Sequence, residues 1–323
     1  MRICFIYNPG SGSGNSRGRK ALAGIEHWLA SHPAAGHALH VTKILPDAER
    51  LALEAHAQGY GQIVAAGGDG TINGVLNSFF DTSGRPRSAA SMGVVYTGTS
   101  PDFCKSYNIP LDPRAALAVV TAATSVRPIP IAEIELQREH GSNTTCTRRF
   151  SCCANIGIGP ELARRANSGA RHRWGDLLGT FFSLLSLLRT FRPLELELVQ
   201  DGQPLRLERT TNVFLGLTRH VASGLQVAHD LDRHHGCLYK LAITGMRLRD
   251  IPRGLLLLYG GRPLGSAPPF ALDYFREIEI RHDHGPAEVE FDGDPAGFLP
   301  CRIRLGDHPL PLCVLELPRS SSS

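Results

Sequence analysis

The sequence has 323 residues, of which 42% are hydrophobic and 20% charged, an ordinary composition for a globular protein. It therefore excludes a disordered or collagen-like chain, and its length is sufficient for two hydrophobic cores. The 34 Lys and Arg nearly balance the 30 Asp and Glu, so the net charge of +4 gives no reason to expect a nucleic-acid partner. The eight cysteines have no CxxC pair and no regular spacing, which favours thiols in a reducing compartment over disulfides or zinc.

The apolar stretches are too short for membrane insertion. The N-terminal run at residues 3–7 is shorter than the apolar core of a signal peptide. The longest apolar-rich stretch, residues 177–191, is interrupted by Ser183, Ser186 and Arg189 and falls short of the roughly 18 apolar residues that a spanning helix needs. We therefore expect no transmembrane segment and a cytoplasmic location, with peripheral contact at a membrane as the alternative.

Over the first 127 residues, short apolar runs alternate with helical patterns, as is typical of a parallel α/β sheet. Strands are expected at 3–7, 39–45, 62–66 and 92–96, and helices at 16–30, 46–58, 72–80 and 113–123.

After Arg127 the pattern changes to period two, which is typical of antiparallel strands. Strands are expected at 131–136, 149–156, 194–199, 205–208, 212–217, 238–243, 270–280 and 287–291, and helices at 160–167, 175–190 and 250–259. The interpretation is an α/β domain over 1–127, to which 303–318 are a candidate addition. An antiparallel domain over 128–302 and a disordered tail over 319–323 complete the chain.

Residues 67–73, GGDGTIN, connect a buried strand to a helix. The glycines bring backbone N–H groups close to a ligand and the helix N-terminus adds positive potential, so this loop suits a phosphate. A lone carboxylate would repel phosphate, so Asp69 fits a role in binding Mg²⁺ or in accepting a proton from an attacking hydroxyl. A tight turn in which Asp69 only caps the helix is the structural alternative.

A second glycine-rich loop, NPGSGSG at 8–14, also lies between a strand and a helix. It fits neither a Walker A loop nor a complete dinucleotide-binding fingerprint. Residues 97–99, Thr-Gly-Thr, end the fourth strand. Because the carboxyl ends of neighbouring parallel strands lie at one edge of a sheet, we expect the three loops to line one crevice.

Together these motifs resemble the diacylglycerol kinase catalytic domain family, which includes bacterial lipid kinases and the sphingosine and ceramide kinases. The matching elements are NPGSGSG at 8–14, Thr42 and Ala48 around the second strand, GGDGTIN at 67–73 with Asn77, GTSPDF at 98–103 leading to Ile109-Pro110, and FDGD at 291–294. The resemblance implies an N-terminal parallel-sheet α/β domain of the NAD kinase and diacylglycerol kinase type, followed by an antiparallel β-sandwich domain that binds the acceptor. It also implies an active site in the cleft between the domains, ATP and Mg²⁺ as cofactors, and a lipid hydroxyl as acceptor.

The resemblance assigns roles position by position. Asn8 and Thr42 are similar to adenosine or ribose contacts, and Thr99 to a further nucleotide contact. The catalytic carboxylates would be Asp69 and, near the acceptor hydroxyl, Asp292 and Asp294; a solvated Asp-Gly-Asp-Pro turn is the alternative for the latter two. The phosphate-binding loop would comprise Gly67, Gly68, Asp69, Gly70, Thr71, Ile72 and Asn73.

Four positions depart from the family pattern. Pro101 replaces an Asn, which removes an amide side chain and a backbone donor. Asp294 stands where the family has a longer Glu, and Gly74 where it usually has a Glu. His235 replaces the Asp that holds a structural Mg²⁺ in some bacterial members, so we expect that site to be absent or altered.

The histidines raise the question of a transition-metal site. His229, His234 and His235 share one polar loop, and His282 and His284 share one face of a strand. Histidines clustered in a polar loop are more often solvated surface, so no metal ligands are assigned to this chain.

The predicted helix at 175–190 is rich in Leu and Phe and follows Arg164, Arg165, Arg171 and Arg173. A buried helix beside solvated arginines is the first interpretation. Contact with an anionic membrane that presents the lipid substrate is the second, and a homodimer interface is the third.

The preferred hypothesis is an ATP-dependent lipid kinase, with diacylglycerol first among candidate acceptors and phosphatidylglycerol, sphingoid bases and polyprenols left open. A catalytically impaired nucleotide- or lipid-binding protein is the alternative, because Pro101, Asp294 and His235 are all changes at family positions. An NAD kinase-like activity is third, since that related group also uses GGDGT; the GTSPDF and FDGD segments favour the lipid branch.

Overall fold

The computed structural model describes residues 1–12, 16–44, 46–122, 125–161, 190–222, 224–292 and 294–315. The chain forms two compact units. The first comprises Met1–Ile131 and the C-terminal segment that begins at Asp307, and the second comprises Ala132–Gly306.

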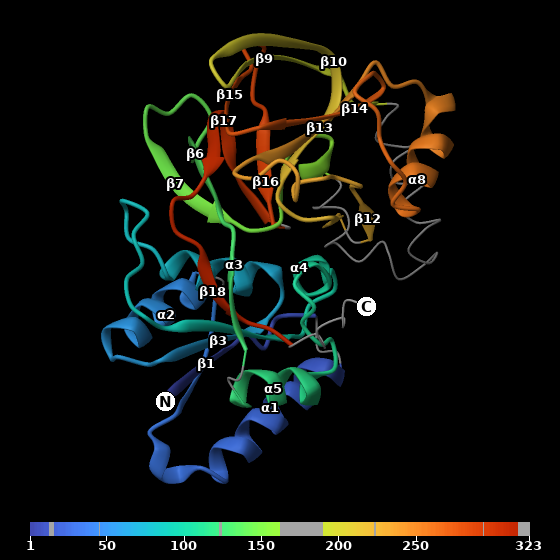
Figure 1. The fold of residues 1–323 in the computed structure, drawn as a ribbon. Helices are drawn as coiled ribbons and strands as arrows, with labels where there is room; N and C mark the ends of the chain where they lie inside the picture. Colours follow the sequence, from blue (N-terminus) through green and yellow to red (C-terminus); the bar gives the residue numbers. More distant parts are fainter. Residues whose placement is uncertain are drawn as a thin grey trace. The chain divides into compact units, whose positions relative to one another are not determined.

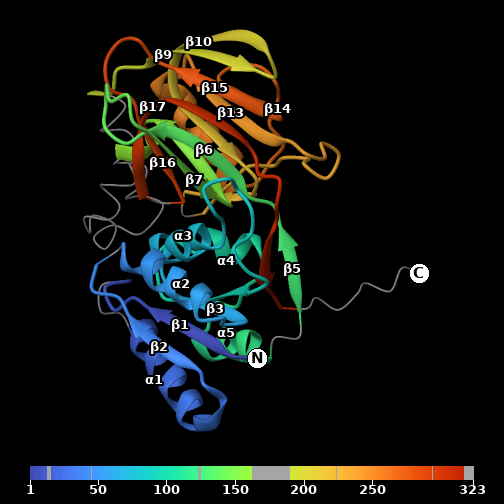
Figure 2. The same ribbon diagram turned by 90° about the vertical axis from the view of Figure 1, so that its left-hand side faces the viewer.

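The first unit is built on a six-stranded sheet with the order β2-β1-β3-β4-β18-β5. Every residue of β1, β3 and β4 is buried, as their continuous apolar sequences require. The strands from β2 to β18 run parallel, and β5 pairs antiparallel with β18. Figure 2 shows β18, drawn in red, beside β5. The bounds are β1 Ile3–Tyr7, β2 Ala38–Val41, β3 Gln62–Gly67, β4 Ser91–Tyr96, β5 Val126–Ile129 and β18 Leu310–Cys313.

Helices cover both faces of this sheet (Figure 1). Helices α1 and α5 pack on the face that carries Phe5 and Val64, through apolar residues such as Ile25 and Val120. Helices α2 and α3 lie on the other face and pack against each other. The helices are α1 Ser16–Ala30, the short 3₁₀ helix Pro33–Ala35, α2 Asp47–Ala57, α3 Asp69–Ser78, α4 Asp102–Ser106 and α5 Pro113–Ala122.

The second unit is dominated by one large antiparallel sheet, with the order β14-β13-β10-β8-β16-β17-β15-β9 and with β6 and β7 attached through β17. Strand β9 also pairs with β10, so the sheet folds back on itself and closes. Its strands are β6 Ala132–Gln137, β7 Thr145–Phe150, β8 Cys153–Gly157, β9 Leu194–Gln200, β10 Gln203–Gly216, β13 Leu238–Thr244, β14 Phe270–Phe275, β15 Glu277–Arg281, β16 Glu288–Phe291 and β17 Asp294–Leu305. A small hairpin of β11 His220–Val221 and β12 Leu225–Gln226, the 3₁₀ helix Leu248–Asp250 and α8 Ile251–Tyr259 complete the described part of the unit.

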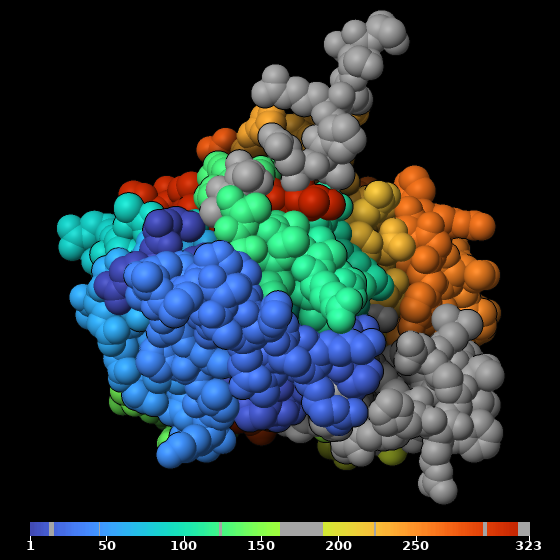
Figure 3. All heavy atoms as spheres, turned by 90° about the horizontal axis from the view of Figure 1, so that it is seen from below, coloured from blue at the N-terminus to red at the C-terminus, as the bar shows by residue number. Residues whose placement is uncertain are grey.

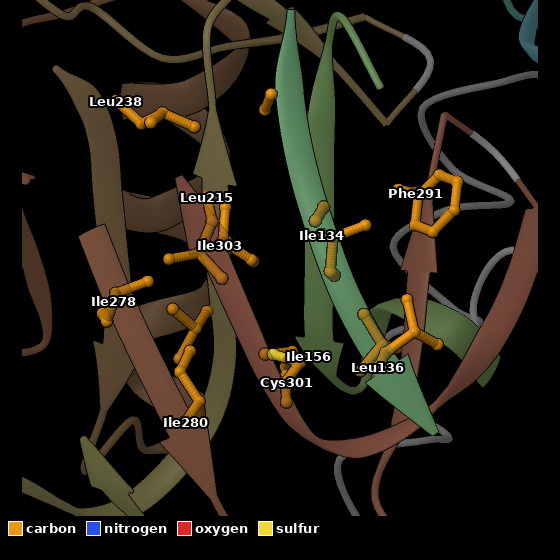
Figure 4. Close-up of a cluster of buried hydrophobic side chains, with 14 of the residues drawn as sticks. Ile134, Leu136, Ile156, Leu215, Leu238, Ile278, Ile280, Phe291, Cys301 and Ile303 are labelled. Atoms are coloured by element: carbon orange, nitrogen blue, oxygen red, sulfur yellow. The ribbon is translucent and has the colours of Figure 1, made fainter. Parts of the chain in front are cut away.

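The closed sheet encloses a core of buried apolar side chains. Side chains such as Ile134, Ile156, Ile278 and Ile303 point inward from opposite sides of the sheet (Figure 4). Glu133 and Arg149 form a buried ion pair beside this core, in which Glu133 accepts a 3.1 Å hydrogen bond from Arg149. Alternation between inward apolar and outward polar residues therefore produces the core that the period-two pattern predicted.

The predicted fold class is confirmed: a parallel α/β unit is followed by an antiparallel, strand-rich unit. Several element predictions were wrong in detail. The run at 149–156 is two strands, because the chain turns at Ser151 and Cys152 between β7 and β8. The runs at 205–208 and 212–217 are one strand, β10, in which Arg209 has a φ of +49° where the partner changes from β9 to β8. The run at 270–280 is divided into β14 and β15.

Strand β17 and helix α4 were not predicted from the sequence. Pro295, Gly297 and Pro300 break the strand pattern of β17. The predicted helices at 160–167 and 175–190, their neighbouring arginines and the tail at 319–323 lie wholly or largely outside the described residues. Among the helices that are described, none is long and apolar enough to cross a membrane.

Candidate active site

Three loops of the first unit meet at the carboxyl ends of β1, β3 and β4. A Cβ atom added to Gly68, after β3, would lie 2.9 Å from Ser11 Oγ of the first loop and 3.3 Å from Gly98 Cα of the third. A Cβ added to Gly98 would lie 2.8 Å from Gly68 Cα. A side chain at either position would collide with the neighbouring loop, so this close approach requires glycine at 68 and at 98.

Asn8 fixes the first loop to the second. Its Nδ2 donates a 3.0 Å hydrogen bond to Thr71 Oγ1, and its Oδ1 accepts a 2.9 Å bond from the N–H of Gly10. The backbone N–H of Asn8 also bonds to Ala66 O at 2.9 Å. Asn8 therefore shapes the loops themselves, and its nucleotide contact stays a prediction.

Asp69 is the first residue of α3 and lies half-buried where the loops meet. Gly68, at the N-cap, has no side chain with which to cap the helix, so the first backbone N–H groups of α3 are suited to an anionic ligand. The hydroxyl of Tyr96 donates a 3.3 Å hydrogen bond to Asp69 Oδ2. Burial, and then the charge of Asp69, raise the pKa of Tyr96 above its ordinary value, so the phenol stays a proton donor that orients this carboxylate.

Arg17 brings a positive charge from α1 to the same loops. Its Nη1 donates a 3.2 Å hydrogen bond to Gly98 O. Burial raises the pKa of the Cys104 thiol, and the negative charge of Asp69 raises it further, whereas the positive charge of Arg17 lowers it. Asp69 and Arg17 therefore both lie close enough to Cys104 to act on its thiol. Sequence reasoning missed Tyr96 and Arg17; a polar residue that ends a buried strand, and a cation in the first turn after a glycine loop, were the available signals.

The remaining residues that were predicted to bind the nucleotide differ in how exposed they are. Thr42 is buried, and its N–H bonds to Tyr7 O at 2.9 Å. Ile72 and Asn73 are buried in α3, where Asn73 accepts hydrogen bonds from Asn77. Thr99, in contrast, is exposed, as are parts of Gly68, Asp69 and Gly70.

Asp292 belongs to the second unit. Phe291 of β16 pairs with Asp294 of β17, so the chain reverses between them and Asp292 takes a φ of +49°. Asp292 and Asp294 therefore do not lie on one face of a single strand. A shared face would have required a straight chain through this segment. Asp294 begins β17, and its side chain is outside the described atoms.

The carboxylate of Asp292 is fixed by backbone donors. Its Oδ1 accepts N–H groups from Cys152 at 3.1 Å and Cys153 at 3.4 Å, and its Oδ2 accepts the N–H of Ser151 at 3.3 Å. The side chain therefore anchors the corner between β7 and β8, an arrangement that suits an ionised carboxylate. The alternative of a freely solvated turn does not describe Asp292.

A second hairpin of this unit also has an Asp whose carboxylate accepts backbone N–H groups. Asp201-Gly202 joins β9 to β10, and Asp201 also has a φ of +49°. Its Oδ1 accepts the N–H groups of Arg276 and Glu277, each at 2.9 Å. Asp201 is thus an internal comparison for what an Asp-Gly hairpin carboxylate does structurally.

The histidine-rich loop packs on aromatic rings. His234 stacks on Tyr274 with ring centroids 3.9 Å apart, and the N–H of Asp230 donates to the Tyr274 hydroxyl at 2.8 Å. His229 stacks on Tyr239 at 5.1 Å. Within the described ranges, no group of three or more His, Cys, Asp or Glu side chains is placed to hold a metal ion.

The described residues form a parallel α/β unit, whose glycine loops meet beside Asp69, and a closed antiparallel sheet. Residues 2–134 match the family model of the diacylglycerol kinase catalytic domain. Over 303 residues, which are 93% of this chain and 91% of the relative, the chain is 31% identical to a diacylglycerol kinase of Bacillus subtilis (strain 168). The chain therefore belongs to the diacylglycerol kinase catalytic domain family, as its motifs predicted.

Solved structures agree on the fold. A diacylglycerol kinase from Bacillus anthracis strain Sterne superimposes with a TM-score of 0.66 at 19% identity, covering 97% of each chain. Yeast NADH kinase superimposes with a TM-score of 0.50 at 14% identity, covering 98% of this chain and 84% of its own.

Proposed function

We propose that this chain is an ATP-dependent lipid kinase that transfers the γ-phosphoryl group to a lipid hydroxyl, with diacylglycerol as the first candidate acceptor. The names of its relatives support a lipid acceptor. The observation that carries the proposal is the convergence of three glycine loops on Asp69 at the start of α3. A cytoplasmic enzyme of this kind meets its substrate at a membrane surface.

The residues at the loops suit a nucleoside triphosphate and its metal ion. The glycine backbone of 67–70 and the start of α3 would hold phosphates, and the Asp69 carboxylate is the type of ligand that Mg²⁺ prefers. When bound, ATP with Mg²⁺ supplies the phosphoryl group and neutralises its charge. Asn8 keeps the first two loops together, and Thr99 is exposed for a further contact.

Phosphoryl transfer requires mainly alignment and charge neutralisation, so a fixed carboxylate matters more than a reactive one. The Tyr96 hydroxyl holds Asp69 in one orientation. A carboxylate near the acceptor would take the hydroxyl proton late in the transfer. We assign that acceptor side to Asp292 and Asp294, with Asp292 also anchoring the corner at Ser151.

The test compares Asp69→Asn with Asp112→Asn, a matched change in which Asp112 accepts the N–H of Ala115 at the start of α5. Each purified protein is incubated with labelled ATP, Mg²⁺ and a mixed lipid extract. We expect Asp69→Asn to reduce lipid labelling at least about a hundredfold, in the range of a lost electrostatic or acid–base group, while thermal unfolding is unchanged. Normal labelling by Asp69→Asn would refute the role given to the loop.

A nucleotide-binding protein without turnover is the second candidate, favoured by the three backbone N–H groups that already occupy the Asp292 carboxylate. In the same experiment it would bind ATP and leave every lipid unlabelled. NAD added as an acceptor tests the third candidate, an NAD kinase-like activity, which would label NAD and leave lipid unlabelled.

A further inference from the structure

Helix α8 and the 3₁₀ turn before it present apolar side chains to solvent. Ile251, Gly254 and Leu258 face inward, and a Cβ on Gly254 would lie 2.5 Å from the Phe270 ring. At about 100° per residue, Leu256 is centred on the opposite face, where its side chain is 65% exposed. Leu248, in the preceding turn, is 51% exposed. Figure 3 shows atoms of this orange segment at the molecular surface.

Four arginines belong to the same stretch of chain as these two leucines. Arg247, Arg249, Arg253 and Arg262 are all exposed. The acidic residue within the same stretch, Asp250, is half-buried and accepts a 2.8 Å hydrogen bond from the backbone N–H of Arg247. The surface therefore combines protruding aliphatic side chains with an excess of positive charge.

We infer that this surface, the α8 face (Arg247, Leu248, Arg249, Arg253, Leu256 and Arg262), docks on an anionic lipid membrane. Leucines that enter the boundary between headgroups and acyl chains gain from burial, and arginines beside them pair with lipid phosphates. Both contributions come from one short stretch of chain, so the two leucines and their arginines can meet one planar surface together.

Charge argues against a second copy of this chain as the occupant. Pairing two α8 faces would bring four arginines against four others around only four leucines, and like charges in contact oppose association. An anionic bilayer offers phosphates to the arginines and an apolar interior to the leucines. Docking also needs neither ATP nor turnover, so it goes beyond the proposed phosphoryl transfer and is measured separately from it.

The test measures co-sedimentation of the full chain with vesicles of phosphatidylcholine, with and without about a third phosphatidylglycerol, without nucleotide. We expect binding only to the anionic vesicles. Leu256→Ser should weaken it about tenfold, and Arg249→Glu/Arg253→Glu about a hundredfold or more. The matched controls are Leu205→Ser, at a leucine that is 41% exposed on β10, and Arg114→Glu/Arg138→Glu, which changes the net charge equally.

Equal binding of the wild type to neutral and anionic vesicles would overturn the inference. It would also be overturned if the α8-face variants bound anionic vesicles as strongly as the wild type does, or if the control variants lost as much binding as they do. A fall in dimer mass for Leu256→Ser, with vesicle binding unchanged, would identify a protein partner and overturn it too. Vesicle binding without any lipid labelling would refute the proposed kinase activity and leave the α8 face supported.

Discussion

The two Asp-Gly hairpins allow the structural and catalytic contributions of Asp292 to be separated. Asp292 uses both carboxylate oxygens, Oδ2 for Ser151 and Oδ1 for Cys152 and Cys153. Asp201 uses Oδ1 for both of its backbone donors. Asparagine tolerates a positive φ and keeps one acceptor oxygen, so Asn substitution tests the second oxygen with little backbone strain.

In Asp201→Asn the amide oxygen can keep both bonds, and only the charge is lost. In Asp292→Asn the amide oxygen can keep the bonds from Cys152 and Cys153, which forces the new NH₂ group against the N–H of Ser151. A hydrogen bond to a charged group contributes about 1.5–3 kcal/mol, so we expect a loss of about 2 kcal/mol at position 292 and less than about 1 kcal/mol at position 201.

Hydrogen–deuterium exchange measures this difference at individual amides. A loss of about 2 kcal/mol corresponds to roughly thirtyfold faster exchange of the Ser151 amide in Asp292→Asn. The amides of Arg276 and Glu277 should change far less in Asp201→Asn. Unchanged protection of Ser151 would refute the anchoring argument. If Asp292 also serves the acceptor, lipid labelling falls in Asp292→Asn and stays at the wild-type level in Asp201→Asn.

Two further predictions concern the first unit. Gly98→Ala should lower stability by about 1–3 kcal/mol, because its Cβ would lie 2.7 Å from Tyr96 Oη, whereas Gly265→Ala, with nothing within 4 Å, should be neutral in thermal unfolding. Burial, and then the charge of Arg87, lower the pKa of His56 to about 4, so the folded chain favours the neutral imidazole. This stabilisation is complete above pH 6.5 and is lost as the pH falls towards 4, by about 2 kcal/mol at pH 5. Denaturant unfolding of the wild type and His56→Gln at pH 7.5 and pH 5 measures this loss, and an equal fall in both proteins would contradict it.

The sequence predicts the first unit well because its signals are local. Continuous apolar runs such as 62–66 end at glycines, and helical periodicity follows directly after them. The second unit is harder to predict because its long strands change partners. Arg209 interrupts the pattern of β10 where its pairing passes from β9 to β8, and only the tertiary pairing shows that the two runs are one strand.

The residues of the candidate site also differ in how well the sequence predicts them. Asp69 and its glycines are adjacent in sequence, so they can be recognised as one motif. Tyr96 and Arg17 come near them only through the register of the sheet and the packing of α1. The anchoring of the 151–153 corner by Asp292 joins segments about 140 residues apart, a separation over which sequence patterns carry little information.

Two departures from the family pattern have local structural reasons. Gly74 lies where α3 crosses α2: a Cβ there would be 3.2 Å from Ala48 Cβ and 3.3 Å from Glu49 N, so a longer side chain would push the helices apart. Pro101 occupies the N-cap of α4, a position whose N–H is not needed by the helix, and its carbonyl accepts the N–H of Lys105 at 2.9 Å. The backbone donor lost at Pro101 is therefore one that α4 does not use. The change is compatible with an intact third loop, so it does not by itself favour a protein that has lost catalysis.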